Sequence, residues 1–293
     1  MSVSTKFERF CSDIRIGSTR INNVSYRYKR ITKQLNIDFW ETDSETSHSL
    51  YVGSYGRDID MLTSDVDMLM RIPYKYYETY DNYDGNGQSA LLQAVRNSLQ
   101  KTYSTTHLKG DGQVVVVAFN DDVKFEILPC FSNKDGVSFT YPDTNSGGSW
   151  KTTNPVLEIK AIKEADDAWN NNLKRLCRMA RAWRYYCSVP IGGLLLDTLA
   201  YDFLENWKHK DKSFTYYDWM VRDFLSYLKS RSESQEYWLA PGSGHRVFRE
   251  GKFEYKALLS YNIAVSAVDH EAAEQDYTAT TEWQKIFGSR FKG

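Results

Sequence analysis

Hydrophobic and polar positions follow different periods in the two halves of this chain. Before Pro155, short runs that alternate in polarity predict strands near 48–53, 65–72, 113–119, 123–128 and 137–141. Apolar residues that recur every three or four positions predict helices over 4–14, about 17–38 and 87–103. After Pro155 the pattern is almost wholly helical, over about 155–169, 171–187, 193–207, 216–230 and 255–271.

This order of elements predicts an α+β protein with a mixed sheet first and helices later. We expect a lobe of mixed strands and helices over 1–150, a helical lobe over 151–293, and a cleft between them. The helix over about 17–38 is long enough to bridge the two lobes, and residues 76–83 are expected to form a surface connector.

The segment 53–69, GSYGRDIDMLTSDVDML, joins a phosphate-binding type of turn to a pair of carboxylates. Gly53 and Ser54 follow an apolar run and precede a stretch able to open a helix, so backbone N–H groups and the Ser54 hydroxyl are expected to bind phosphate. In a strand, Asp65 and Asp67 project from one face while Val66 faces the core on the other. A divalent cation such as Mg²⁺ removes the repulsion between two such carboxylates.

A third acid is expected on a neighbouring strand, because two metal ions need a further ligand. Residues 113–119 and 123–129, joined by a turn at 120–122, form a predicted hairpin. Glu126 lies between apolar neighbours, on the face opposite Phe125, and is our candidate. The alternative is an ordinary exposed strand-face glutamate, whereas Asp121 and Asp122 are best explained as turn residues.

A GS turn or a DxD pair alone is common on protein surfaces, but their order and spacing here are more specific. The pattern GS-x(10)-DxD resembles the polymerase-beta-like nucleotidyltransferase superfamily. VKFEILPCF at 123–131, GSWKTTNP at 148–155 and NLKRLCRMARAW at 172–183 together resemble the CD-NTases, the cyclic-oligonucleotide synthases of bacteria and animals. In that family the third acid is usually Asp, so Glu126 is a departure.

The resemblance implies a nucleotidyltransferase lobe and an enzyme that condenses NTPs into a cyclic di- or trinucleotide second messenger of anti-phage defence. It implies two Mg²⁺ ions, with Mn²⁺ as a substitute, held by Asp65, Asp67 and Glu126, and a downstream effector that binds the product. A synthase of linear 2'-5' oligonucleotides would share this site. Two further functions are compatible with the pattern: a nucleotidyltransferase that modifies a small molecule, and a binding module without activity.

A basic helix supplies candidates for triphosphate binding. Lys174, Arg178 and Arg181 lie at i, i+4 and i+7, on a single helical face. By resemblance, Arg178 and Arg181 occupy the region of the family's triphosphate-binding lysine; the alternative is salt bridges to Asp166 and Asp167 or contact with solvent alone. Gly193 stands where the family commonly has a serine, and its amide at a helix N-terminus is expected to donate to the nucleotide.

Composition and charge narrow the function further. The net charge of −1 and pI near 6.5 argue against a broad nucleic-acid-binding surface and against a nucleic-acid activator. No run of about 18 apolar residues occurs, and the N-terminus has no apolar signal core, so we expect a cytoplasmic protein without a membrane span.

The C-terminal segment 287–293, FGSRFKG, resembles the tail through which some bacterial CD-NTases are joined to other molecules by a ubiquitin-ligase-like partner. Conjugation through Gly293 requires residues 288–293 to be exposed and weakly packed. The alternative is an ordinary frayed chain end.

Overall fold

The computed structural model describes residues 1–61 and 65–293, and the chain divides into two compact units. The sheet unit comprises Ile16–Asp58 and the described residues 65–159. The helical unit comprises Met1–Arg15, residues 59–61 and Lys160–Gly293. The first fifteen residues therefore group with the helical unit, whereas the sequence placed all of 1–150 in one lobe.

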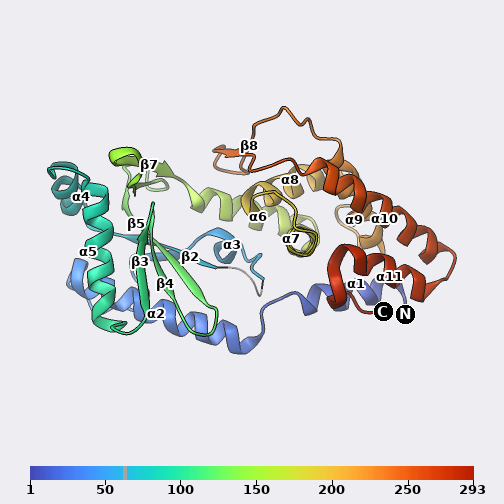
Figure 1. Cartoon of the computed structure of the whole chain (residues 1–293), viewed down its shortest axis with the longest axis horizontal. Coiled ribbons are helices and arrows are strands. Elements are labelled where there is room, and N and C mark those ends of the chain that lie inside the picture. Colours follow the sequence, from blue (N-terminus) through green and yellow to red (C-terminus); the bar gives the residue numbers. More distant parts are fainter. Residues whose placement is uncertain (62–64) are drawn as a thin grey trace. The chain divides into compact units, whose positions relative to one another are not determined.

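In the described part of the sheet unit, seven strands form one mixed sheet (Figure 1). Its main path runs in the order β1 (Ser49–Tyr51), β2 (Val66–Arg71), β5 (Lys124–Ser132), β4 (Val114–Ala118) and β3 (His107–Asp111). β6 (Phe139–Asp143) and β7 (Ser149–Thr153) extend from β5. β2 and β5 are parallel, and β4 and β5 form the predicted antiparallel hairpin. β3 and β7 were not predicted.

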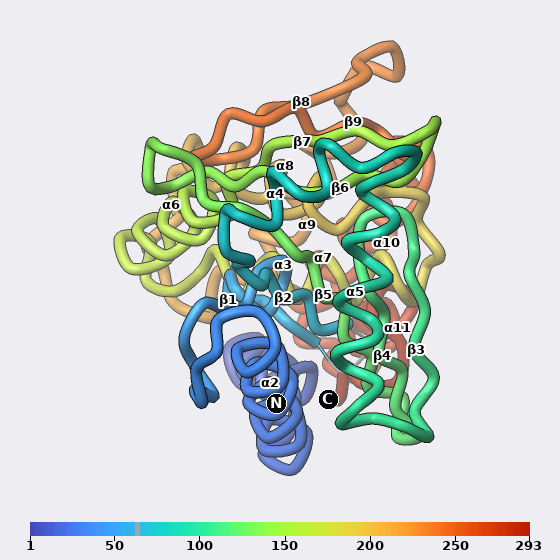
Figure 2. Tube along the Cα trace, turned by 90° about the vertical axis from the view of Figure 1, so that its left-hand side faces the viewer, coloured from blue at the N-terminus to red at the C-terminus, as the bar shows by residue number. Residues whose placement is uncertain are grey.

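Helices α2 (Ser18–Trp40) and α5 (Gly87–Thr102) cover one face of this sheet. Figure 2 shows α5 running along β3 and β4. Val66, Met68 and Met70 of β2 are buried in this core, so the intervening Asp67 lies on the opposite face, as the alternation predicted. Most of the connector expected at 76–83 belongs to the helix α4 (Tyr74–Asp81), in which Tyr76, Tyr77 and Tyr80 pack against the core.

The helical unit packs its helices around a second core, which includes Leu176, Trp183, Leu196 and Trp283. Its helices are α1 (Val3–Asp13), α7 (Asn172–Tyr186), α8 (Gly193–Asn206), α9 (Tyr217–Lys229), α10 (Glu254–Ala272) and α11 (Asp276–Phe287), together with most of α6 (Pro155–Ala168). β8 (Tyr237–Leu239) and β9 (Arg246–Phe248) form a hairpin. Short 3-10 helices span Asn145–Gly147, Phe214–Tyr216 and Gly288–Arg290. No helix within the described residues is long and apolar enough to cross a membrane.

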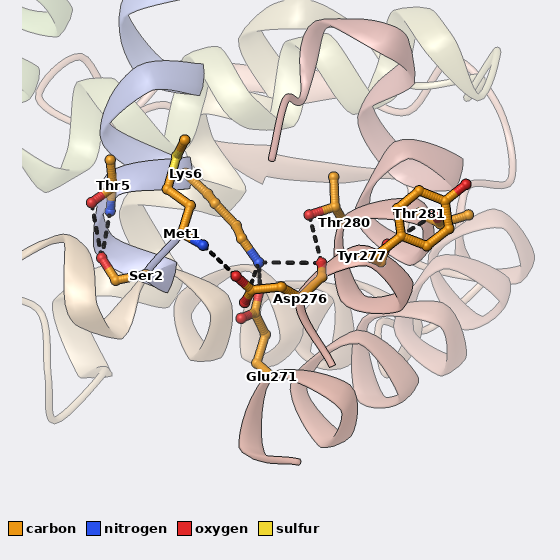
Figure 3. Close-up of polar contacts among 9 residues, drawn as sticks. All are labelled: Met1, Ser2, Thr5, Lys6, Glu271, Asp276, Tyr277, Thr280 and Thr281. Carbon is orange, nitrogen blue, oxygen red and sulfur yellow. Dashed lines mark hydrogen bonds and ion pairs between the residues drawn. The ribbon is translucent and has the colours of Figure 1, made fainter. Parts of the chain in front are cut away.

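A buried ion pair joins α1 to the C-terminal helices, as Figure 3 shows. The Lys6 side chain is fully buried, and its Nζ donates to Glu271 Oε1 at 3.0 Å and to Asp276 Oδ1 at 3.3 Å. The Met1 amino group also contacts Asp276. Phe291 is fully buried against aromatic rings of α1 and α11. The two ends of the described chain are therefore fixed to each other by both charge and apolar packing.

Replacing Lys6 by Met should destabilise the helical unit, because it leaves the Glu271 carboxylate buried without its cation. We expect the free energy of unfolding to fall by about 3–5 kcal/mol, measured by denaturant unfolding followed by tryptophan fluorescence. Lys33→Ala is the control, since Lys33 and Asp43 form an exposed pair 2.8 Å apart and its loss should cost at most about 1 kcal/mol. Equal small losses in both variants would contradict a structural role for Lys6.

Candidate active site

The GS turn packs directly onto the DxD strand. Gly53 begins the single-turn helix α3 (Gly53–Gly56), and the Val52 N–H donates to the Asp67 carbonyl oxygen at 3.0 Å. Gly53 has φ +58°, and a Cβ at this position would lie 1.8 Å from Asp67 Oδ2. Only glycine fits both the backbone conformation and this approach. Ser54 is largely buried at 6% exposure, so little of its side chain reaches the surface.

The third acid lies beside the second because β2 and β5 pair in parallel. The register places Asp67 opposite Glu126 and Val66 opposite Phe125. Phe125 is fully buried, so Glu126 projects from the face that carries Asp67. The structure therefore brings together Gly53, Asp67 and Glu126, the first of which was predicted to bind phosphate and the other two to bind metal.

A lysine that the sequence analysis did not single out completes this cluster. Lys124 Nζ lies 2.8 Å from Asp65 Oδ2 and 2.8 Å from Glu126 Oε1. Partial burial lowers the pKa of Lys124, but hydrogen bonds and attraction to the two carboxylates outweigh it and raise the pKa well above its usual range. Lys124 stands two residues before Glu126 on the same strand face, which is the signal that identifies it in the sequence.

The side chains of the cluster remain accessible from solvent. The exposed fractions are 47% for Asp65, 35% for Lys124 and 30% for Glu126. Side chains exposed to this extent can be reached by charged molecules from solution.

These carboxylates fit a divalent cation in their chemistry. Oxygen donors are the ligands that Mg²⁺ prefers, and one ammonium already reaches both Asp65 and Glu126, so the two acids share a cation. In the described residues, however, no three His, Cys, Asp or Glu side chains converge closely enough to form a metal site. Asp67 is paired with Glu126 in the register of the two strands and lies on the same face of the sheet.

The predicted triphosphate-binding residues belong to the helical unit, where Arg181 has a structural partner. Its Nε and Nη2 donate to the two carboxylate oxygens of Asp197 at 3.0 and 2.6 Å. Asp197, on α8, is 1% exposed. A Cβ at Gly193 would lie 3.1 Å from Arg181 Nη1, so these two predicted residues are neighbours. The sequence analysis did not identify Asp197 as the partner of Arg181. Its position as the one acid within the apolar helix sequence GLLLDTLA could have indicated a buried charge that needs a cation.

Arg178 and the N-terminus of α8 also have charged surroundings. Arg178 is 6% exposed, and its charge acts on Asp166. Burial raises the pKa of Asp166, and the hydrogen bond and nearby cations offset this only in part. Lys174 Nζ lies 3.8 Å from Asp166 Oδ2. At the start of α8, a Cβ at Gly192 would lie 2.4 Å from Glu250 Oε1. A protein carboxylate therefore lies beside the helix end at which the sequence analysis expected the nucleotide.

A comparison with protein families gives a match over the first part of the chain. The model of the Second Messenger Oligonucleotide or Dinucleotide Synthetase domain matches residues 1–166. The chain belongs to this family. Its resemblance to the CD-NTases is thereby confirmed. A probable cyclic nucleotide synthase of Bacillus cereus strain VD146 is 24% identical over 229 residues, which are 72% of this chain and 65% of that protein. The match thus spans slightly less than two thirds of the relative.

Solved structures of other family members share the fold. CdnC of E. coli MS115-1, with ATP, has a TM-score of 0.71 at 18% identity, with 99% of each chain covered. The same protein in complex with HORMA-deltaN gives the same TM-score. The cyclic AMP-GMP synthase DncV of Vibrio cholerae, with nonhydrolyzable GTP, has a TM-score of 0.61 at 17% identity over 84% of this chain and 69% of that chain. The predicted α+β, polymerase-beta-like fold is confirmed.

Replacing Arg181 by Ala should destabilise the protein, because Asp197 is buried and loses the two hydrogen bonds that it accepts from Arg181. We expect a loss of about 2–4 kcal/mol in the free energy of unfolding, measured by denaturant titration, because hydrogen bonds to charged groups are the stronger ones. Lys163→Ala, which removes an exposed pair with Asp167 on α6, should cost at most about 1 kcal/mol. Wild-type stability of Arg181→Ala together with a raised KM for NTP would instead assign Arg181 to the triphosphate.

Proposed function

We propose that this protein is a metal-dependent nucleotidyltransferase that joins NTPs, with release of pyrophosphate, into a cyclic di- or trinucleotide second messenger. The observation that carries this proposal is the cluster in which the GS turn meets Asp67, Asp67 pairs with Glu126, and Glu126 shares a cation with Asp65. Membership of the synthetase family supports it. Anti-phage signalling is the biological setting that the family resemblance implies.

In the proposed reaction, a ribose hydroxyl oxygen bonds to the α-phosphorus of an NTP as the bond to the β-phosphate breaks and pyrophosphate leaves. Asp65, Asp67 and Glu126 would hold two Mg²⁺ or Mn²⁺ ions, which when bound lower the pKa of the attacking hydroxyl and neutralise the leaving group. The backbone at Gly53 and Ser54 would hold the β and γ phosphates. Ring closure requires the linear intermediate to react a second time.

Partners and location follow from the same chemistry. The substrates are NTPs, the product requires an effector that binds it, and an NTP-consuming synthase belongs in the cytoplasm. Triphosphate contacts by Arg178, Arg181 and the Gly193 amide remain part of the proposal. Arg181 already pairs with Asp197. It would therefore contact the triphosphate either while it keeps this pair or after it releases Asp197.

Conjugation through Gly293 is a weaker proposal than synthesis. Gly293, Lys292 and Arg290 are exposed, but Gly288 and Phe291 are buried, and Lys292 Nζ lies 3.6 Å from Asp13. The requirement that all of 288–293 be weakly packed is therefore not met. A ligase-like partner would have to accept a short exposed end or release Phe291 from the core.

The central test is substitution of the acids. Asp65→Asn combined with Asp67→Asn, and Glu126→Gln alone, should each lower turnover at least about 100-fold, because charge stabilisation in the transition state is lost. Glu126→Asp should retain part of the activity. Asp121→Asn is the matched control, since Asp121 pairs with Arg27 on α2 at 2.8 Å and its activity should stay near that of the wild type.

Products should be identified by incubating the protein with all four NTPs and Mg²⁺, followed by mass spectrometry after nuclease treatment. Cyclic products support the proposal. Linear 2'-5' products would select the linear synthase, and transfer to an added small acceptor would select a modifying enzyme. Normal turnover in the folded Asp65→Asn, Asp67→Asn variant would remove the metal assignment altogether.

A further inference from the structure

Lys124 occupies a defined position among the proposed metal ligands. It is the first residue of β5, and its backbone pairs with Ala118 of β4. Its side chain crosses the strand face to reach Asp65 Oδ2 and Glu126 Oε1, each at 2.8 Å. The backbone is fixed by the sheet, whereas a lysine side chain has a flexible four-carbon stem and can move away without disturbing the fold.

A divalent cation would need the same two carboxylates. Mg²⁺ binds carboxylate oxygens at about 2.0–2.1 Å and tolerates little distortion of its ligand shell. An ammonium and a metal ion that share two carboxylates would also repel each other at short range. A metal ion bound by Asp65 and Glu126 would therefore compete with Lys124 for these two carboxylates.

We infer that Lys124 is a built-in competitor of the divalent cation at this site. In the metal-free protein its ammonium holds Asp65 and Glu126 together and offsets their repulsion. Metal binding requires Lys124 to leave these carboxylates, so the lysine weakens the affinity for free metal. This inference rests on the proposed metal site and assigns a role in that site to a residue outside the acid trio.

The test is a direct measurement of Mn²⁺ binding without nucleotide, by the electron paramagnetic resonance signal of free Mn²⁺. Lys124→Met should bind Mn²⁺ at least about fivefold more tightly than the wild type, because the competing charge is gone. Raising the salt concentration should reduce this difference, since exposed charges are screened. Lys124→Gln should behave in the same way, which keeps the test valid if the Met variant folds poorly.

Two control variants separate competition from a general change in charge. Lys109→Met removes the same charge from β3 of the same sheet, where Lys109 Nζ pairs with Asp111 Oδ2 at 2.7 Å. Its Mn²⁺ affinity should stay within about twofold of the wild type, because exposed charges that do not share a ligand interact weakly. Lys124→Arg keeps the charge and should not tighten binding.

The outcomes distinguish this inference from the proposed function. Unchanged or weaker Mn²⁺ binding in both Lys124→Met and Lys124→Gln would overturn the competition, as would equal tightening in Lys109→Met. If Mn²⁺ binds the wild type and the Lys124 variants equally and Asp67→Asn abolishes binding, the metal site stands and only the role of Lys124 fails. If Mn²⁺ binds none of them, the metal site fails and the inference with it.

Discussion

The parallel pairing of β2 with β5 is the constraint on which the candidate site depends. It sets two carboxylates, Asp67 and Glu126, on adjacent strands in the same register. Neighbouring strands lie about 5 Å apart, at which two like charges repel by roughly 1–3 kcal/mol between bulk water and a protein surface. Two carboxylates on adjacent strands therefore need a cation nearby to offset their repulsion. Lys124 provides one on the same face through Asp65 and Glu126, and in the proposed reaction metal ions replace it.

The turn at Gly53, which precedes β2, packs closely against Asp67 of that strand. A residue larger than glycine at position 53 would strike the Asp67 carboxylate, and the positive φ there is one that other residues rarely adopt. The Val52 N–H bond to the Asp67 carbonyl holds the turn against the strand. The turn proposed to bind phosphate and the strand proposed to bind metal are thus one packed feature, so a substitution at Gly53 would disturb both proposed functions together.

The sequence predicts those features of the fold and the site whose signal lies in residues close together along the chain. Alternation along 65–70 and the hairpin around 120–122 depend on nearest neighbours, so the face of Asp67 and the pairing of β4 with β5 were predictable. β3, β7 and α11 have weak periodicity and are held by tertiary contacts, so they were missed. The cation shared by Asp65 and Glu126 depends on the register of β2 with β5, which involves residues about 60 positions apart and has no local signature.

Burial separates the charges that serve the fold from those that can serve a ligand. In the helical unit, Lys6 with Glu271 and Arg181 with Asp197 are enclosed, and breaking either pair strands a charge away from water. In the sheet unit, the side chains of Asp65, Lys124 and Glu126 are each about a third to a half exposed. Asp65 and Glu126 can therefore exchange Lys124 for another cation at low cost. Helical spacing placed Arg181 on a basic face but carried no information about Asp197. The buried acid on α8 that faces Arg181 is therefore what the basic stripe alone could not show.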